Sequence, residues 1–318
     1  MSAPACPGCG ETRVASAPAK GTGTAPFFVE RCRACGLGWT SPALSDAEIA
    51  DWYPQGYYGD GNARFHPLLE RLVRLFQTRR ARVIRRRAAS GKVLDVGCGR
   101  GFLLKTLRRL GFEPHGVELC EHSAWHARNR LHIPVHVGAL STAPYAKGAF
   151  SAVVFWHTLE HFAKPFEMLA LAHGLLKPGG LLVVAVPNSE SLQAAVAGTD
   201  WFHLDVPRHY WHFGASSLKR ALDRAGFTVV KEDHFSFEQN PYGWLQSLLN
   251  LVTPRFNFLY DWLKTKSART APLRKNPKQA LWTLGLAAVG APLAVLLTVL
   301  EAGLRRGGTV EMYAVKRG

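Results

Sequence analysis

The sequence predicts an α/β fold, and the centre of the chain carries this prediction. Residues 93–96 form an apolar strand that runs into Gly97, Gly99 and Gly101, and an amphipathic helical segment follows. Glycines at such a turn let the backbone bend sharply and approach a ligand closely. With 318 residues and a hydrophobic fraction of 47%, the chain has room for a complete α/β core and small additions.

The chain is strongly basic, with a formal net charge of +16 at pH 7. Such a charge predicts an anionic partner, namely phosphate groups, nucleic acid or an anionic membrane surface. The first residues, MSAPACPGCGETR, lack a basic segment followed by an apolar run, so they do not resemble a secretory signal. We therefore expect a cytoplasmic protein whose cysteines are reduced.

Two C-x2-C pairs lie near the start of the chain and predict a zinc ribbon over residues 1–45. The four residues are Cys6, Cys9, Cys32 and Cys35. Each pair is followed by glycine, and such turns bring two thiolates onto one tetrahedral ion. Four protein ligands leave no position for water, so we expect the zinc to be structural. A redox motif or a chance pairing is the alternative, and Cys98 and Cys120 are interpreted as free thiols.

Residues 46–90 are expected to connect the ribbon to the main domain and to end in a basic helix. The segment WTSPALSDAEIADWYPQGYYGDG is aromatic and rich in turn-forming residues. The helix after it has an apolar face from Leu68, Leu72, Leu75 and Phe76, and it carries many arginines. A solvated helix face is one interpretation, and a contact with phosphate or a membrane is the other.

The stretch DVGCGRG, residues 95–101, matches the first motif of the class I methyltransferases that use S-adenosylmethionine (SAM). It is not the dinucleotide fingerprint, because Phe102 stands where that fingerprint needs a third glycine. The chain resembles this family over residues 91–238. The resemblance implies a Rossmann-like seven-stranded sheet, with strand two ending at Glu118, strand three at Gly138 and strand four at Trp156 and His157. Strands five and six are expected in LLVVAVPN and FTVVKEDHF.

The resemblance also implies how SAM binds. In this family the glycine loop passes under the methionine part, an acid orients the ammonium, and a second acid binds both ribose hydroxyls. Asp95 and Glu118 match these acids, and a carboxylate offers two acceptor oxygens for two hydroxyls. Ala139 and Leu140 replace the acid that often reads adenine, so backbone and apolar contacts are expected there. The implied cofactor contacts are Asp95, Gly97, Cys98, Gly99, Gly101, Glu118, Leu119, Leu140 and Trp156.

Methyl transfer requires the acceptor to be held in line, and it requires a base when the acceptor carries a proton. The segment after strand four supplies His157, Glu160 and His161. We expect a helix to begin at Glu160, and the i, i+4 spacing lets both histidines face one pocket. Similar O-methyltransferases bind a divalent metal at the matching positions. A second, divalent metal is therefore one alternative here, and bracing of the loop is the other.

The segment after strand five, WFHLDVPRHYWHFGASSL, is rich in histidine and aromatic residues. Zinc-ribbon methyltransferases that act on nucleotide-linked sugars have Y-H-E-H at this point, and the last histidine is a base. The matching residues here are Val206, Pro207, Arg208 and His209. His209 is therefore our first choice of catalytic base, with Arg208 as a candidate partner for a substrate phosphate. His212 is interpreted as structural.

Three functions remain open at this level. The first is methyl transfer to a sugar or other small polar acceptor, phosphate-linked or lipid-linked, and the zinc ribbon and the His209 segment favour it. The second is RNA methylation, but residues 155–158, FWHT, lack the N-P-P-Y pattern of nucleobase amino methyltransferases. The third is a non-catalytic SAM-binding interaction protein. The sequence favours no single acceptor atom and no oligomeric state.

The segment LWTLGLAAVGAPLAVLLTVLEAGL, residues 281–304, contains Glu301 as its one charge. As a helix it would rise about 36 Å, enough to cross a hydrocarbon core of roughly 30 Å. The alternating pattern TVEMYAVKR then predicts a final core strand in 309–318, so residues 239–308 form an insertion with both ends on one side of any bilayer.

Basic residues on both flanks agree with ends that stay in the cytoplasm. We expect Pro292 to kink or break the helix, giving two halves. A monotopic attachment to the cytoplasmic face of a membrane is therefore predicted, with a buried helix or a dimer interface as the alternatives. This attachment favours a lipid-linked glycan acceptor over RNA.

Overall fold

The computed structural model describes residues 5–20, 27–43, 48, 67–253, 255–263 and 277–318. Of the connector and basic helix predicted over residues 46–90, residues 46, 47 and 49–66 therefore lie outside the described residues. The chain divides into two compact units. The sheet unit comprises Arg71–Val186, Leu218–Glu232 and Glu311–Gly318, and the cysteine unit comprises Met1–Glu70, Pro187–Ser217 and Asp233–Val310.

A seven-stranded sheet forms the centre of the sheet unit, in the order β10-β11-β8-β7-β4-β5-β6. The strands are β4 (Lys92–Val96), β5 (Glu113–Glu118), β6 (Val135–Val137), β7 (Phe150–Trp156), β8 (Leu176–Pro187), β10 (Phe227–Asp233) and β11 (Thr309–Lys316). Parallel pairing joins β6, β5, β4, β7 and β8. The strand order confirms the predicted class I methyltransferase sheet, including the final strand beside strand six.

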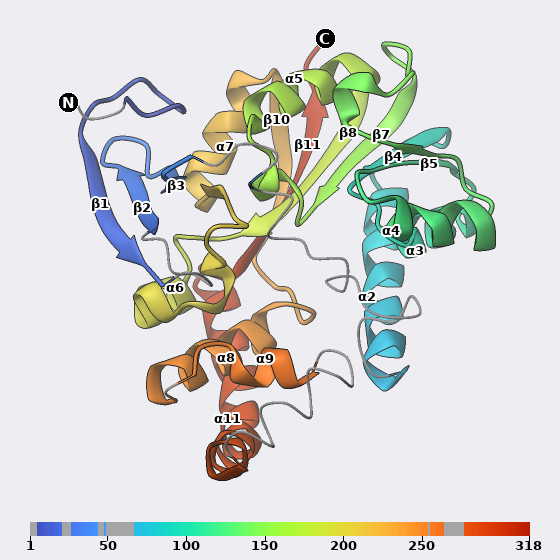
Figure 1. Ribbon diagram of the computed structural model, residues 1–318. Coiled ribbons are helices and arrows are strands. Elements are labelled where there is room, and N and C mark those ends of the chain that lie inside the picture. Colours follow the sequence, from blue (N-terminus) through green and yellow to red (C-terminus); the bar gives the residue numbers. More distant parts are fainter. Residues whose placement is uncertain (1–4, 21–26, 44–47, 49–66, 254, 264–276) are drawn as a thin grey trace. The chain divides into compact units, whose positions relative to one another are not determined.

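Helices pack on this sheet, whose central strands β4, β7 and β8 are apolar along most of their length. They are α2 (Pro67–Arg85), α3 (Phe102–Arg109), α4 (Glu121–Trp125), α5 (Pro165–Leu175) and α7 (Ala215–Arg224). Strands β7 and β8 are buried almost throughout, as expected for strands covered on both faces. In one core cluster Ile84 of α2 packs with Leu103 and Leu107 of α3 and with Val154 of β7. Figure 1 shows α2 alongside the strands of this unit.

Arg79 and Arg80 of α2, and Arg87 just after this helix, contact groups of the sheet unit itself. The Arg80 guanidinium carbon lies 3.3 Å from the centre of the Trp156 ring, and that of Arg87 lies 5.5 Å from the Tyr313 ring. Arg79 lies 3.7 Å from a carboxylate oxygen of Glu311. Stacking over aromatic rings is favourable for guanidinium groups. Part of the basic helix predicted as a solvated or phosphate-binding face therefore stabilises its own core.

The cysteine unit begins with a four-stranded sheet in the order β1-β2-β3-β9. Its strands are β1 (Val14–Ala19), β2 (Phe27–Cys32), β3 (Gly38–Ser41) and β9 (Trp211–His212). Strand β9 pairs antiparallel with β3, with Gly38 opposite His212 and Trp39 opposite Trp211. The histidine-rich segment after strand five therefore contributes one strand, β9, to the cysteine-bearing sheet. The sequence did not predict this pairing.

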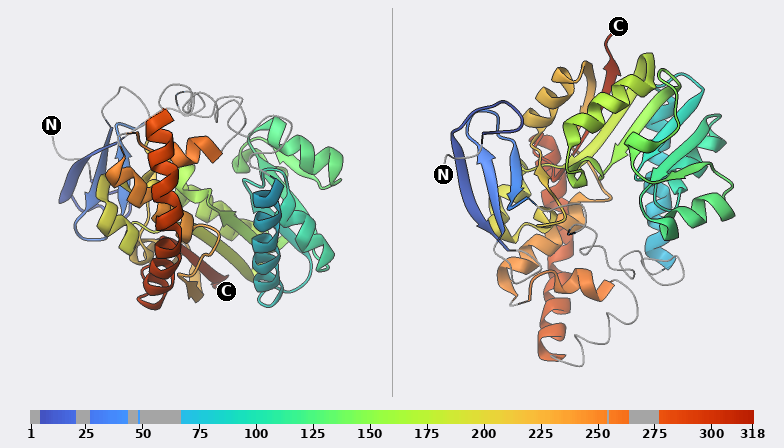
Figure 2. Two further views of the ribbon diagram at one scale, coloured as in Figure 1. Left: turned by 90° about the horizontal axis from the view of Figure 1, so that it is seen from below. Right: turned by 45° about the horizontal axis from the view of Figure 1, so that its top comes forward.

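Three further helices of this unit are α8 (Asn240–Val252), α9 (Phe258–Leu263) and α11 (Pro277–Gly303). Figure 2 shows the long α11 beside α8. Of the kink or break expected at Pro292, the break is wrong, because α11 continues through this residue. Proline at 292 cannot donate a hydrogen bond to the carbonyl of Ala288, and both residues are exposed, so water can reach this position.

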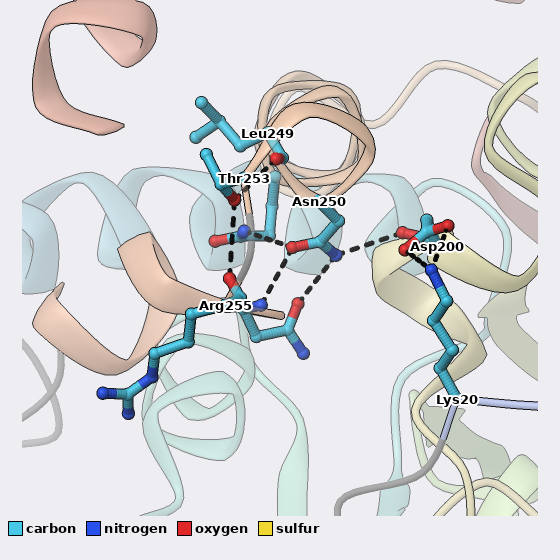
Figure 3. A network of polar contacts seen from close by, with 8 residues as sticks. Lys20, Asp200, Leu249, Asn250, Thr253 and Arg255 are labelled. Carbon is cyan, nitrogen blue, oxygen red and sulfur yellow. Dashed lines mark hydrogen bonds and ion pairs between the residues drawn. The ribbon is translucent and has the colours of Figure 1, made fainter. Parts of the chain in front are cut away.

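A buried polar network fastens α8 within the cysteine unit (Figure 3). The Lys20 ammonium lies 2.6 Å and 2.7 Å from the two carboxylate oxygens of Asp200, and Asn250 Nδ2 donates to the Asp200 carbonyl at 3.0 Å. Thr253 Oγ1 donates to the carbonyl of Leu249 at 2.7 Å and closes the last turn of α8. Satisfied polar groups of this kind fix one orientation of a buried helix.

Candidate active site

The glycine loop after β4 has a backbone that only glycine adopts readily. Gly97, Gly99 and Gly101 have φ values of 77°, 50° and 74°. A Cβ atom at Gly97 would lie 2.3 Å from Cγ2 of Thr158. The Gly97 N–H donates to the carbonyl of Val117 at 2.8 Å, which ties the loop to β5. Both the turn and the close packing therefore require glycine at 97.

Glu118 ends β5, and its carboxylate is held by backbone donors on both oxygens. Gly99 N–H donates to Oε2 at 2.8 Å, and Cys120 N–H donates to Oε1 at 3.0 Å. Burial raises the pKa of Glu118, and these two donors oppose that rise. Each oxygen has a second lone pair, so the fixed carboxylate can still accept hydrogen bonds from a ligand.

Asp95 lies within β4, where its side chain is 5% exposed. Burial raises the pKa of this carboxyl to about 7, and the Arg80 guanidinium opposes the rise. Trp156, under Arg80, ends the neighbouring strand β7. A buried carboxyl near the carboxyl ends of two parallel strands is placed to meet a cationic group, which would favour its ionised form.

The other predicted cofactor contacts differ in exposure. Leu119 is 70% exposed, whereas Leu140 and Cys98 are buried. A Cβ atom at Gly116 would lie 2.5 Å from Cys98 Sγ, so the thiol packs against β5. Cys98 can therefore contact a ligand in the glycine loop through its backbone and not through its sulfur.

The segment after β7 is fastened to the glycine loop. Thr158 Oγ1 donates to the carbonyl of Val96 at 3.1 Å, and Thr158 Cγ2 fills the space above Gly97. His157 has a left-handed backbone with φ 51°, and its N–H donates to the carbonyl of Ala185 at 2.8 Å. The neighbouring strands β4 and β7 therefore bring the cofactor loop and His157 to one edge of the sheet.

His157 and Glu160 form a close pair in this segment. His157 Nδ1 lies 3.4 Å from Glu160 Oε1, and the Glu160 side chain is 1% exposed. His157 Nε2 is buried and has no hydrogen-bond partner within the described part of the chain. This pairing holds the imidazole with its Nε2 turned away from the carboxylate.

The expected helix from Glu160 is wrong in its position. Residues Leu159–His161 form a single 3-10 turn, and α5 begins at Pro165, since proline suits the first turn of a helix. His157 lies before this turn with a left-handed backbone. The i, i+4 argument that placed His157 and His161 on one helix face therefore does not apply.

The Gly-rich loop and the anchored carboxylate fit SAM. Three glycines bring backbone close to a ligand, and the buried Glu118 carboxylate is fixed at the end of the next strand. Asp95 adds a second acid on β4. A ligand with vicinal hydroxyls and an ammonium group can use both acids, because hydroxyls donate to a carboxylate and an ammonium group pairs with one.

His209 lies in the cysteine unit, where its position is fixed by local contacts. Its Nδ1 lies 2.8 Å from the carbonyl oxygen of His203, which assigns the ring proton to Nδ1. Nε2 lies 3.9 Å from Asp205 Oδ2. Thr40 Oγ1 of β3 donates to the His209 carbonyl at 2.7 Å. The hydrogen bond from Thr40 therefore holds the histidine-rich segment against the cysteine-bearing sheet.

Arg208, the candidate partner for a phosphate, donates to Asp205 through two N–H groups, with Nε to Oδ2 at 2.9 Å and Nη2 to Oδ1. Sequence spacing could not reveal this pairing, because Asp205 has the unusual left-handed φ of 41°. His212 is buried as a structural residue, and burial lowers its pKa to about 3. Its Nε2 lies 3.0 Å from Thr40 Oγ1.

The four N-terminal cysteines converge on one point and fit a tetrahedral ion. Sγ of Cys6 lies 3.5 Å from that of Cys35, and Sγ of Cys9 lies 3.6 Å from that of Cys32. All four sulfurs lie within 4.8 Å of one another. Zinc–sulfur bonds of about 2.3 Å place tetrahedral ligands about 3.8 Å apart, so the spacing matches zinc.

Comparisons with known proteins place the chain in a methyltransferase family. A family model described as a methyltransferase domain matches residues 64–232. The ubiquinone biosynthesis O-methyltransferase of Ruegeria pomeroyi is 31% identical over 168 residues, which cover 49% of this chain and 67% of that protein. The enzyme of the same name from Thiobacillus denitrificans is 32% identical over 173 residues, covering 51% and 72%.

Solved structures include SAM-dependent methyltransferases of similar organisation. One from Archaeoglobus fulgidus is 21% identical, with a TM-score of 0.47, and the match covers 76% of this chain and 93% of that one. One from Mesorhizobium loti is 15% identical, with a TM-score of 0.47, covering 76% and 98%.

Proposed function

Because the chain belongs to the family of SAM-dependent methyltransferases, we propose that it methylates a hydroxyl group of a small, lipid-linked acceptor. The observation on which this proposal chiefly depends is the position of the Glu118 carboxylate, which the N–H groups of Gly99 and Cys120 hold beside the glycine loop. The hydroxyl acceptor is supported by the relatives, which are named as O-methyltransferases. Their names also refer to ubiquinone, a lipid-soluble quinone, which supports a lipid-linked molecule.

In this proposal Glu118 binds the ribose hydroxyls of SAM, and Asp95 orients the ammonium group. Their positions at the ends of neighbouring strands support both roles. SAM, when bound, supplies a methyl group on a sulfonium, a good leaving group. The chain then has two tasks, namely to hold the acceptor in line and to remove its proton.

We assign the proton transfer to His157. Glu160 lies beside Nδ1, which favours a proton on that nitrogen and leaves Nε2 to accept one. With SAM bound, a bond between the acceptor oxygen and the methyl carbon would form as the carbon–sulfur bond breaks. The hydroxyl proton passes to His157 Nε2. Glu160 acts as a positioning residue, since its carboxylate orients and stabilises the imidazolium. His161 completes the turn.

His209, the base favoured by the sequence, stays a prediction. Its Nδ1 contact with the His203 carbonyl supports the same tautomer, with Nε2 as the acceptor. A sugar acceptor, as in the zinc-ribbon methyltransferases, is the second candidate function. The observation that favours it is the pairing of β9 with the cysteine-bearing sheet. This pairing brings the four cysteines and the histidine-rich segment, both features of that class of enzyme, into one unit. We also propose structural zinc at the four cysteines, while a divalent metal at Glu160 and His161 stays a prediction.

A transfer assay separates these possibilities. Purified protein with radiolabelled SAM would be offered a polyprenylated catechol, a polyprenyl-linked sugar, a nucleotide sugar and total RNA. We expect label in the catechol first, and label in either sugar substrate would favour the second candidate. Label confined to RNA, or SAM binding without transfer to any acceptor, would contradict the proposal.

The base is tested by comparing His157→Ala with His209→Ala in the same assay. We expect His157→Ala to lower kcat by about 100-fold or more, which is typical for loss of a general base, with SAM affinity unchanged. Glu160→Gln should lower kcat less and shift the pH profile. His122→Ala, a change of an exposed histidine on α4, serves as the control. A large loss in His209→Ala alone would reassign the base.

A further inference from the structure

In the helix α11 the polar face is buried and the apolar face is exposed, which is the reverse of a surface helix in a water-soluble protein. Its buried residues are small or polar: Ala280, Thr283, Ala294, Thr298 and Glu301. Its exposed residues include large apolar ones, namely Leu281, Trp282, Val289, Leu293, Val295, Leu296, Val299 and Leu300. Val289 is 78% exposed and Leu281 72%. In ordinary surface helices the apolar stripe faces the core.

Hydrogen bonds on the inner face fix this orientation. Glu301 Oε1 accepts from Gln193 Nε2 at 3.0 Å and from Gly308 N–H at 3.1 Å. Gln193 Nε2 also donates to the carbonyl of Asn240, at the start of α8. The buried Thr298 hydroxyl is satisfied within α11, since Oγ1 donates to the carbonyl of Ala294 at 2.8 Å. A rotation of α11 that buried the leucines would break the bonds of Glu301 in the interior, which is costly.

The exposed face suits lipid more than water. Contiguous apolar patches of this extent are uncommon on soluble monomers and mark interaction sites. Trp282 lies near one end of the helix, and tryptophan is enriched at membrane interfaces. Leu251 and Val252, at the end of α8, are also exposed and apolar. Exposed cations stand at both ends of α11, namely Lys278, Arg305 and Arg306. These cations complement anionic headgroups.

The chain topology restricts how α11 can meet a bilayer. Among the described residues it is the one helix long and apolar enough to cross a membrane. The chain leaves the seven-stranded sheet at Asp233 and returns to it at Thr309. A single crossing would place these two ends of one sheet on opposite sides. The described helices between them, α8 and α9, have 13 and 6 residues and are too short to cross back.

We propose that the exposed face of α11 is a membrane-docking surface that lies in the plane of an anionic bilayer interface. The large apolar side chains enter the acyl boundary, the terminal cations meet anionic headgroups, and the polar inner face stays on the protein. The attachment is monotopic and reversible. It does not depend on the proposed methyl transfer, because every residue of the docking surface lies outside the cofactor site.

Vesicle flotation of the full-length protein tests this proposal. We expect binding to vesicles of phosphatidylcholine with phosphatidylglycerol, and weaker, salt-insensitive binding to phosphatidylcholine alone. The triple variant Leu281→Gln, Val289→Gln and Leu296→Gln should lose at least about tenfold in vesicle affinity, since each change removes an apolar side chain that the bilayer would bury. The control variant carries Leu75→Gln, Val196→Gln and Val230→Gln, which alter exposed apolar residues outside α11, and should bind as the parent does.

Two results would overturn the proposal. One is a parent protein that binds neither vesicle type and is a dimer in light scattering, when the α11 triple variant is a monomer. This result would assign the exposed face to a second copy of the chain. The other is equal loss of binding in both triple variants. SAM titration of each variant keeps the outcomes separate, because a variant that binds SAM as the parent does is folded. Loss of vesicle binding with transfer intact would leave the proposed function standing.

Discussion

Gly97 is constrained in two independent ways, by its backbone angle and by its neighbour. Its φ is 77°, and a Cβ atom would meet Thr158 Cγ2 at 2.3 Å. Gly111 has a comparable φ of 88°, with nothing within 4 Å of its Cβ position. The two glycines therefore separate backbone strain from steric overlap.

We predict that Gly97→Ala costs about 2–4 kcal/mol of unfolding free energy, whereas Gly111→Ala costs about 1 kcal/mol. Thr158→Ser in the Gly97→Ala background should restore part of the loss, because it removes Cγ2 and keeps the hydroxyl that bonds the Val96 carbonyl. Urea unfolding of the four proteins measures this. Equal costs for both alanine variants, without rescue, would show that the packing argument is wrong.

Asp95 should make SAM binding depend on pH. Its pKa in the folded protein is about 7, raised from 3.8 by burial. The carboxyl is therefore largely protonated below pH 7 in the free protein, and an ammonium ligand favours its ionised form. SAM affinity should rise with pH, on the order of tenfold between about pH 5.5 and 7.5.

Titration calorimetry at several pH values checks this prediction with matched variants. Asp95→Asn should bind weakly and without this slope. Glu113→Gln, a change of an exposed acid on β5, should keep the slope. A parent affinity that is flat across this range would mean that Asp95 does not meet the ammonium.

At the scale of elements, α11 buries an acid that favours its neutral form. Burial raises the pKa of Glu301 from 4.5 to about 7. The unfolded chain ionises first as pH rises, so stability due to the neutral carboxyl is present below about pH 4.5 and is lost towards pH 7. Glu301→Gln keeps a neutral side chain at every pH. The variant should therefore gain up to about 3 kcal/mol relative to the parent between pH 4.5 and 7.

Urea unfolding at the two ends of this pH range measures the gain. Glu167→Gln, a change of an exposed acid on α5, should track the parent at both pH values. If Glu301→Gln were less stable than the parent by the same amount at both ends, Glu301 would be ionised when buried, contrary to its assigned state.

The cysteine-bearing sheet links a metal to the histidine segment, because β9 pairs with β3. We predict one zinc per chain by elemental analysis. Cys9→Ser and Cys32→Ser should lose it, and Cys120→Ser, a change of a thiol outside the cluster, should retain it. Loss of zinc should increase the amide exchange of Trp211 and His212, since their partner strand loosens. Full zinc content in Cys32→Ser would contradict the four-thiolate site.

At the scale of the whole molecule, the sequence predicted the sheet well and the loops less well. The final strand was predicted within residues 309–318, and β11 spans Thr309–Lys316, because an alternating pattern after an apolar insertion leaves few alternatives. The family resemblance carried by the glycine loop implied that Glu118 ends the next strand, and β5 ends at this residue. Strand periodicity and glycine chemistry are local signals, so a single sequence carries them.

The errors concern features that depend on tertiary contacts. The turn at Leu159–His161 replaced an expected helix, because Thr158 is held by Val96 and Gly97 from a distant segment. The helix α11 passes through Pro292, which a local rule treats as a break. The pairing of β9 with β3 joins residues far apart in the chain, and two-residue strands leave no pattern to find.

The central claim is that Glu118, beside the glycine loop, binds SAM for methyl transfer. Titration calorimetry of SAM with the parent, Glu118→Gln and Glu121→Gln tests it most directly, because Glu121 is an exposed acid on the next helix. We predict that Glu118→Gln weakens SAM binding by about tenfold or more, as expected when a charge-assisted hydrogen bond is lost, and that Glu121→Gln binds as the parent does. Equal SAM affinity in all three proteins would contradict the account.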